Sequence, residues 1–126
     1  MPVNFFKQIL SFSDIEDELN DYFTDAGDYY FGDDNIDVDI SLSGAEDGLV
    51  YKATLDFSNA EDYDNLEDVS KTKVKGFLNA LKSEINSIIE DTDFEGADIT
   101  GKAIDNDNSS YYVKYNDSTY TFSWDY

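Results

Sequence analysis

Hydrophobic residues in the first quarter of the chain recur at the spacing of an α-helix. A short amphipathic stretch comes first and contains Phe5, Phe6, Ile9 and Leu10. A second stretch starts at Ser13, which together with Glu16 has the pattern of a capping box. Its inner positions are Ile15, Leu19, Tyr22 and Phe23. Gly27 and Gly32 favour turns or left-handed backbone, so we predict that this helix ends before them.

The pattern changes to alternation at DDNIDVDISL, residues 33–42. One parity of this stretch is aliphatic, with Ile36, Val38, Ile40 and Leu42, and the other carries Asp37, Asp39 and Ser41. A second alternating stretch, GLVYKATLDF, follows the turn-forming segment SGAEDG. Two such stretches joined by a short turn predict an antiparallel hairpin with one apolar face and one face that exposes carboxylates.

The strongest helical pattern runs from Ser70 to Asp91. Its apolar stripe consists of Val74, Phe77, Leu78, Leu81, Ile85, Ile88 and Ile89. Three more alternating stretches follow within residues 94–104, 109–117 and 118–126. This order predicts a single α+β domain over residues 1–126, with a largely antiparallel sheet of about five strands. We expect two or three helices to pack on one face of the sheet and the other face to be open to water.

The composition adds a large negative charge to this picture. The 126 residues include 29 Asp and Glu against 8 Lys and no Arg, which gives a formal net charge of −21. Aromatic residues make up 16% of the chain, so it has the material for a packed core that disordered acidic chains lack. Asp outnumbers Glu by 21 to 8, and Asp prefers caps, turns and strand edges. We therefore expect a folded domain with short carboxylates held close to the backbone.

The chain has no Cys and no His, which excludes disulfides, thiolate and imidazole metal ligands, and His-based catalytic triads. A carboxylate pair could act as acid and base only if an apolar pocket raised one pKa, and the acids here lie mainly in polar, turn-rich segments. We therefore expect a binding protein without enzymatic activity or a cofactor. No apolar run approaches the ~20 residues of a membrane span, and the N-terminus does not have the pattern of a signal peptide. We expect a cytoplasmic protein, with a mature exported domain as the alternative.

One segment has the alternating oxygen ligands that Ca²⁺ prefers. Asp105, Asp107 and Ser109 have the spacing of the first three ligands of an EF-hand loop. The sixth position of that loop needs Gly but is Ser110, and the twelfth needs Glu but is Asn116. Because Asn and Asp are also typical of hairpin turns, we favour a turn over a calcium site and predict no metal.

The charge argues against direct binding of nucleic acid, which needs Lys and Arg to neutralise phosphates. The charge instead favours a protein that imitates nucleic acid. Carboxylates can stand in for phosphates at alternate strand positions, ~6.6 Å apart, or at i, i+3 and i+4 along a helix. The candidate partner-binding residues are Glu16, Asp17, Asp21, Asp25, Asp28, Asp33, Asp34, Asp37, Asp39, Glu61, Asp62 and Asp64. Four aromatic residues are candidates either for anchors among these acids or for the core: Tyr29, Tyr30, Phe31 and Tyr63.

In size, acidity, Asp abundance and lack of Arg, the whole chain resembles the DNA-mimic inhibitors of phages and mobile elements. These include anti-CRISPR, anti-restriction and uracil-DNA glycosylase inhibitor proteins. The resemblance is one of overall character without a shared motif, and it assigns no residues. It implies a stoichiometric inhibitor that occupies the basic nucleic-acid groove of a host protein such as a Cas nuclease or a restriction enzyme. The alternatives are an immunity protein that neutralises a nuclease toxin, an unspecialised acidic domain, and an exported adhesion or uptake domain.

Overall fold

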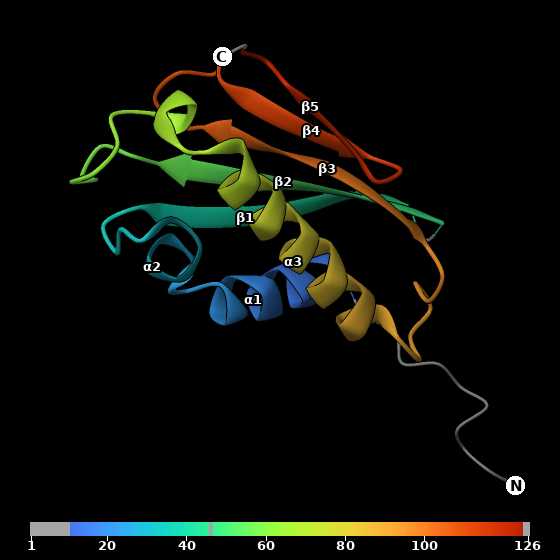
Figure 1. Cartoon of the computed structure of the whole chain (residues 1–126). Coiled ribbons are helices and arrows are strands. Elements are labelled where there is room, and N and C mark those ends of the chain that lie inside the picture. The colour runs from blue at the N-terminus through green and yellow to red at the C-terminus, as the bar shows by residue number, and fades with distance from the viewer. Residues whose placement is uncertain (1–10, 46, 125–126) are drawn as a thin grey trace, which may run out of the picture.

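The computed structural model describes residues 11–45 and 47–124 and confirms the α+β class (Figure 1). Its helices are α1 (Phe12–Tyr22), α2 (Ala26–Phe31), the short 3₁₀ helix η2 (Leu66–Asp68) and α3 (Lys71–Ile89). Its strands are β1 (Asp37–Ala45), β2 (Gly48–Asp56), β3 (Asp98–Asp105), β4 (Tyr112–Asn116) and β5 (Thr119–Phe122). The amphipathic stretch expected at residues 5–10 lies outside the described residues.

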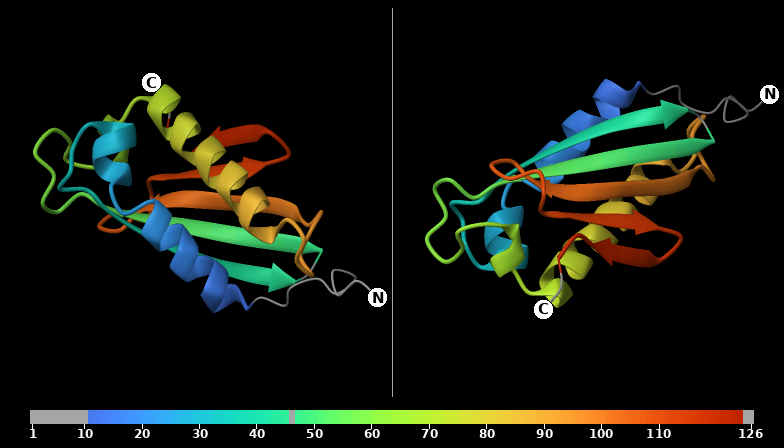
Figure 2. Two further views of the ribbon diagram at one scale, coloured as in Figure 1. Left: turned by 90° about the horizontal axis from the view of Figure 1, so that it is seen from below. Right: turned by 90° about the horizontal axis from the view of Figure 1, so that it is seen from above.

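The five strands form one sheet in the order β1-β2-β3-β4-β5. Three neighbouring pairs are antiparallel, as the sequence predicts, but β2 and β3 run parallel. The parallel pair follows from the connection, because the chain leaves β2, passes through α3 and enters β3 in the same direction, which needs a long crossover. The three α-helices described here lie on one face of the sheet, and the opposite face is uncovered (Figure 2).

The core lies between the sheet and the helices. Alternate residues of β2 are fully buried, namely Leu49, Tyr51, Ala53 and Leu55. From the other side, α3 contributes Val74, Phe77, Leu78, Leu81, Ile85 and Ile89. The strand parity and the helical stripe expected from the sequence are therefore confirmed, and burial of this apolar surface is the main driving force for the fold.

The start of α1 and the segment after it differ from the sequence-based expectation. Ser11 is the N-cap instead of Ser13: its side chain accepts a hydrogen bond from the Asp14 N–H (3.1 Å), and the Asp14 carboxylate accepts one from the Ser11 N–H (3.2 Å). Both serines precede an acid by three residues, so the local pattern alone does not choose between them. The segment expected to be a turn forms α2, which ends at Gly32 in the left-handed region with φ 75°.

Side chains of α1 cover the outer edge of the sheet. The amide of Asn20 pairs with the backbone of Ile40, because its Oδ1 accepts from the Ile40 N–H (2.9 Å) and its Nδ2 donates to the Ile40 carbonyl (2.9 Å). The Glu16 Oε2 atom accepts from the Leu42 N–H (2.7 Å). These bonds satisfy groups of β1 that would otherwise form an open strand edge, and they fix α1 beside that edge.

Candidate partner-binding surface

A stripe of carboxylates runs along the exposed side of α1 and consists of Asp14, Asp17, Glu18 and Asp21. These positions follow i, i+3, i+4 and i+7, so they share one side of the helix, opposite the buried Ile15 and Leu19. The stripe extends over about 10 Å at ~1.5 Å per residue, or one negative charge per about 3.5 Å. A single strand of duplex DNA carries one charge per ~3.4 Å of axis, so the linear charge densities are alike.

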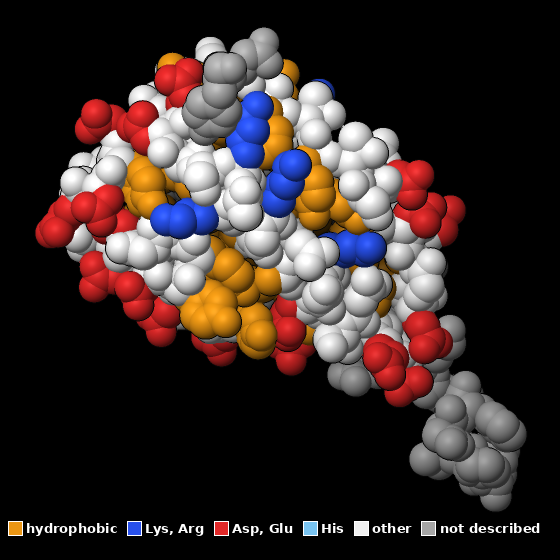
Figure 3. Space-filling model, in the orientation of Figure 1, with side chains coloured by type: hydrophobic (Ala, Val, Ile, Leu, Met, Phe, Trp, Pro, Cys, Tyr) orange, Lys and Arg blue, Asp and Glu red, His pale blue; other side chains and the backbone are white. Residues whose placement is uncertain are grey.

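The structure separates the acids predicted to bind a partner into three exposed groups. The helix layer carries Asp17, Asp21, Asp25 and Asp28. The uncovered face of β1 carries Asp37 and Asp39. The loops at one end of the sheet carry Asp34, Glu61, Asp62 and Asp64. Figure 3 shows the helix layer, with acidic side chains around its margin and lysines nearer its centre.

Two of the predicted acids, Glu16 and Asp33, are used inside the fold. Glu16 binds the edge of β1, as described above. Asp33 is only 4% exposed, and its Oδ2 accepts from the N–H groups of Glu61 (2.7 Å) and Asp62 (2.9 Å). Chief among the causes, the hydrogen bond from Asp62 holds the pKa of Asp33 below its usual value. We therefore leave both out of the proposed contact surface and assign them the role of positioning it.

Two exposed tyrosines stand beside the carboxylate stripe. Tyr22, expected on the inner side of its helix, is 62% exposed, and Tyr29 is 80% exposed. Each ring meets a ring beneath it edge to face, Tyr22 on Phe23 (4.9 Å between centroids) and Tyr29 on Tyr30 (4.7 Å). With Asp25 and Ala26, these four aromatic residues line a hollow of about 260 Å³, which we call the tyrosine hollow.

A second, acidic hollow of about 350 Å³ adjoins the first and is lined by Glu18, Asp21, Tyr22 and Glu84. Glu84 comes from α3, which brings a carboxylate from a distant part of the sequence to the side of α1. Burial, and then the nearby charge of Glu18, raises the pKa of Glu84. Within the described ranges, none of these three carboxylates forms an ion pair with a lysine closer than 4.0 Å. Together the two hollows form an aromatic and anionic site.

The other aromatic candidates lie mainly in the core. Phe31 is buried, and the Tyr63 hydroxyl donates to the Phe31 carbonyl (2.7 Å) and accepts from the Lys73 Nζ (3.3 Å). Tyr30 is half-buried below Tyr29, and burial is the first cause that raises its pKa. Of the four aromatic candidates, Tyr29 alone is mainly exposed. Sequence reasoning missed the exposure of Tyr22 because it treated this residue as part of the inner stripe.

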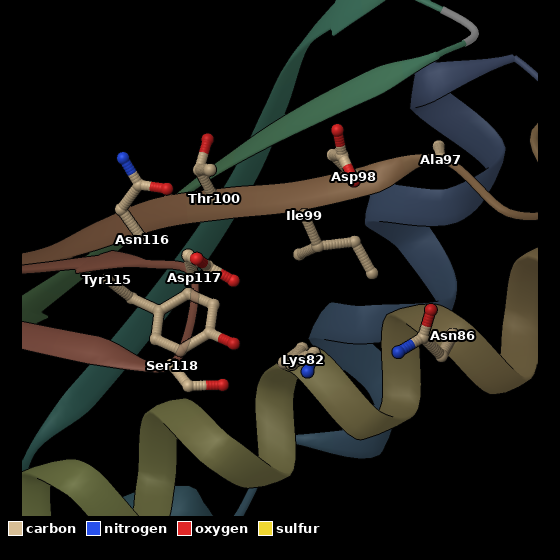
Figure 4. A pocket seen from close by; sticks show the side chains of 10 residues that line it. All are labelled: Lys82, Asn86, Ala97, Asp98, Ile99, Thr100, Tyr115, Asn116, Asp117 and Ser118. Atoms are coloured by element: carbon tan, nitrogen blue, oxygen red, sulfur yellow. The ribbon is translucent and has the colours of Figure 1, made fainter.

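A further hollow of about 470 Å³ lies between α3 and the β4–β5 turn (Figure 4). The Lys82 Nζ atom lies 5.8 Å from the centroid of the Tyr115 ring. Although burial acts in the opposite direction, interactions with Lys82 and Ser118 lower the pKa of Tyr115. Lys82 of α3 and Ser118 of the β4–β5 turn both interact with Tyr115, so this residue links the turn to α3. We assign this cluster a structural role.

The turn considered for calcium is built around a buried carboxylate. Asp105 is 2% exposed, and its Oδ1 accepts from the N–H groups of Asp107 (2.8 Å) and Asn108 (3.2 Å). Its Oδ2 accepts from the N–H of Leu66 (2.9 Å), which ties the turn to η2. Over residues 11–45 and 47–124, no three acidic side chains come together as they would to hold a metal ion. In the same ranges no helix is long and apolar enough to span a membrane.

Comparison with protein-family models, with curated proteins and with solved structures gave no match in any of the three.

Proposed function

We propose that this protein is an acidic DNA-mimic inhibitor of the anti-CRISPR or anti-restriction type. It binds the basic nucleic-acid groove of a host defence or DNA-processing protein in the host cytoplasm and blocks it stoichiometrically, without catalysis. The observation that carries the proposal is the site on α1 and α2, where a carboxylate stripe with DNA-like spacing adjoins two exposed tyrosines.

The site is suited to a cationic partner because its charges are already in place. The stripe lies on a helix whose N-terminus is capped and whose side chains are bonded to β1, so little ordering is needed on binding. The rings of Tyr22 and Tyr29 can contact arginine or lysine side chains through cation–π interactions. Aromatic residues in a ring of polar groups are typical of the residues that dominate binding energy in interfaces.

The proposal can be tested by capture from the lysate of a bacterial host, followed by competition. We expect the wild-type protein to retain a basic nucleic-acid-binding protein, and duplex DNA to displace it from that partner. The variant Asp17→Lys/Asp21→Lys should lose capture. The matched control is Asp107→Lys/Asp117→Lys, which changes the net charge equally at exposed acids outside the site and should retain capture.

Two outcomes would count against the proposal: equal loss of capture by the two variants, or a partner that binds DNA and this protein at the same time. Capture of a nuclease toxin, with protection from its activity, would instead support the immunity-protein alternative. That alternative uses the same acidic surface.

A further inference from the structure

Three lysines stand side by side on the uncovered face of the sheet. Lys52 of β2 is directly opposite Lys102 of β3, and Lys102 is directly opposite Lys114 of β4. Their neighbours along each strand, such as Tyr51 and Ala103, are buried beneath the helices, so the three lysines share the opposite face. They form a row across the middle of the sheet, which we call the lysine row.

On β2, β3 and β4, the positions next to the lysine row carry no carboxylate. The row on one side consists of Thr54, Ile104 and Tyr112, and the row on the other consists of Val50, Thr100 and Asn116. In Figure 4, Thr100 and Asn116 point to the side of the sheet opposite Ile99, which faces α3. The acids that the described strands carry on this face are Asp37, Asp39, Asp56 and Asp98. Asp39 pairs with Thr54 and is therefore diagonal to Lys52, and Asp98 is the first residue of β3. In a chain with 29 acidic residues, these three rows are neutral or positive at each position on β2, β3 and β4.

The arrangement is unfavourable for the protein alone. Neighbouring strands are ~4.8 Å apart, and like charges directly opposite one another destabilise a sheet. None of the three ammonium groups has a carboxylate within 4.0 Å among the described residues, and that of Lys114 lies 5.4 Å from the centroid of the Tyr112 ring. Lysines that only offset the negative charge of the chain would be expected opposite carboxylates. Lysines gathered opposite one another are better explained by an anion that binds all three.

A hollow at the lysine row supplies both the space and further hydrogen-bond donors. Its volume is about 480 Å³, within the usual range of small-molecule sites. Besides the three lysines, its lining includes the hydroxyls of Ser41, Ser43 and Thr100 and the amide of Asn116. Hydroxyls, amides and ammonium groups are donors that oxyanions accept from.

We propose that the lysine row binds a small multivalent oxyanion, such as a condensed phosphate or a polycarboxylate. Three ammonium groups in a row favour an anion with several charges. A net charge of −21 repels long polyanions such as nucleic acid and leaves a small ligand as the occupant. This inference does not rest on the function proposed above, because the lysine row lies on the other face of the sheet from α1 and α2.

Isothermal titration calorimetry of the full chain at low ionic strength tests the inference, with inorganic tripolyphosphate and citrate as separate probes. We expect saturable one-to-one binding of at least one probe, and tighter binding of tripolyphosphate than of orthophosphate. Tripolyphosphate alone would identify a phosphate site, and citrate alone a carboxylate site. Lys102→Gln should weaken binding at least about tenfold, because it removes the central charged donor.

The matched control is Lys73→Gln, which removes an exposed lysine from α3 on the other face. It changes the net charge by the same amount and should leave the affinity within about twofold. Both variants are at accessible positions, and circular dichroism checks that they fold. Non-saturable heats with both probes, or equal weakening by the two variants, would overturn the inference.

Discussion

Several acidic side chains in this protein bind backbone rather than solvent, and Asp105 is the most buried of them. Its carboxylate accepts from three N–H groups on two segments, those of Leu66, Asp107 and Asn108. Asp105→Ala leaves at least the Leu66 donor buried without a partner. A buried unsatisfied donor costs ~1–3 kcal/mol, so we expect a loss of about 3 kcal/mol in the free energy of unfolding. Urea denaturation measures this, and the exposed Asp107→Ala is the control, expected to change stability by less than about 1 kcal/mol.

Substitution of Glu84 is expected to stabilise the protein, in contrast to substitution of Asp105. Its folded pKa is raised, first by burial and then by Glu18, so the ionised form is less favourable in the folded protein than in the unfolded chain. The penalty is full at neutral pH and disappears as the pH falls below the unfolded value of about 4.3. Glu84→Gln should therefore stabilise the protein at pH 7 but not at pH 4. A gain of equal size at both values, or the same gain from the exposed Glu90→Gln, would rule out the electrostatic explanation.

At the scale of elements, α1 has two roles, since one side presents the carboxylate stripe and another protects the edge of β1. Asn20 makes two hydrogen bonds with Ile40. Asn20→Ala should lower the free energy of unfolding by about 2 kcal/mol, at ~1 kcal/mol for each bond, and should expose a strand edge that favours association. Thermal denaturation and size-exclusion chromatography measure the two effects. Asp17→Ala, an exposed change on the same helix, should show neither.

The sequence predicted the individual helices and strands better than it predicted their pairing and packing. Alternation gave the parity of β1 and β2, and helical spacing gave the buried side of α3, because both are local patterns. The parallel pairing of β2 with β3 was missed, because it depends on where α3 returns the chain. The cap at Ser11 was missed because Ser13 has the same local pattern.

In the candidate site, too, local sequence pattern predicted exposure better than contacts between distant segments. Most of the acids predicted to be exposed are exposed, since Asp-rich polar segments rarely enter a core. Local pattern could not separate these from Asp33, which accepts hydrogen bonds from residues about thirty positions away. Nor could it place Glu84 next to Glu18, because α1 and α3 meet only in the folded chain.

At the scale of the whole molecule, the charges are segregated. On the helix layer, acids lie around the margin and lysines nearer the centre (Figure 3), and the uncovered face has its own row of lysines. Exposed acids are dense on α1, α2 and the loop at residues 61–64, which carry most of the predicted contact residues. A cationic partner would be steered toward that side, and the exposed tyrosines there would supply the short-range contacts.

If the carboxylates steer the partner and the tyrosines make the short-range contacts, the two classes of variant should differ in their binding kinetics. Surface plasmon resonance with the captured partner measures the association and dissociation rates. Asp17→Asn/Asp21→Asn should lower the association rate and flatten its dependence on salt, because steering is screened over about 10 Å at 0.1 M salt. Tyr22→Ala/Tyr29→Ala should leave the association rate nearly unchanged and raise the dissociation rate at least about tenfold, as expected for anchor residues. Val50→Ala, at the remaining large hydrophobic side chain that the structure describes as exposed, is the control and should change neither rate. If the tyrosine variant instead changed only the association rate, or if Val50→Ala weakened binding as much, the tyrosine hollow would not be the anchor of the interface.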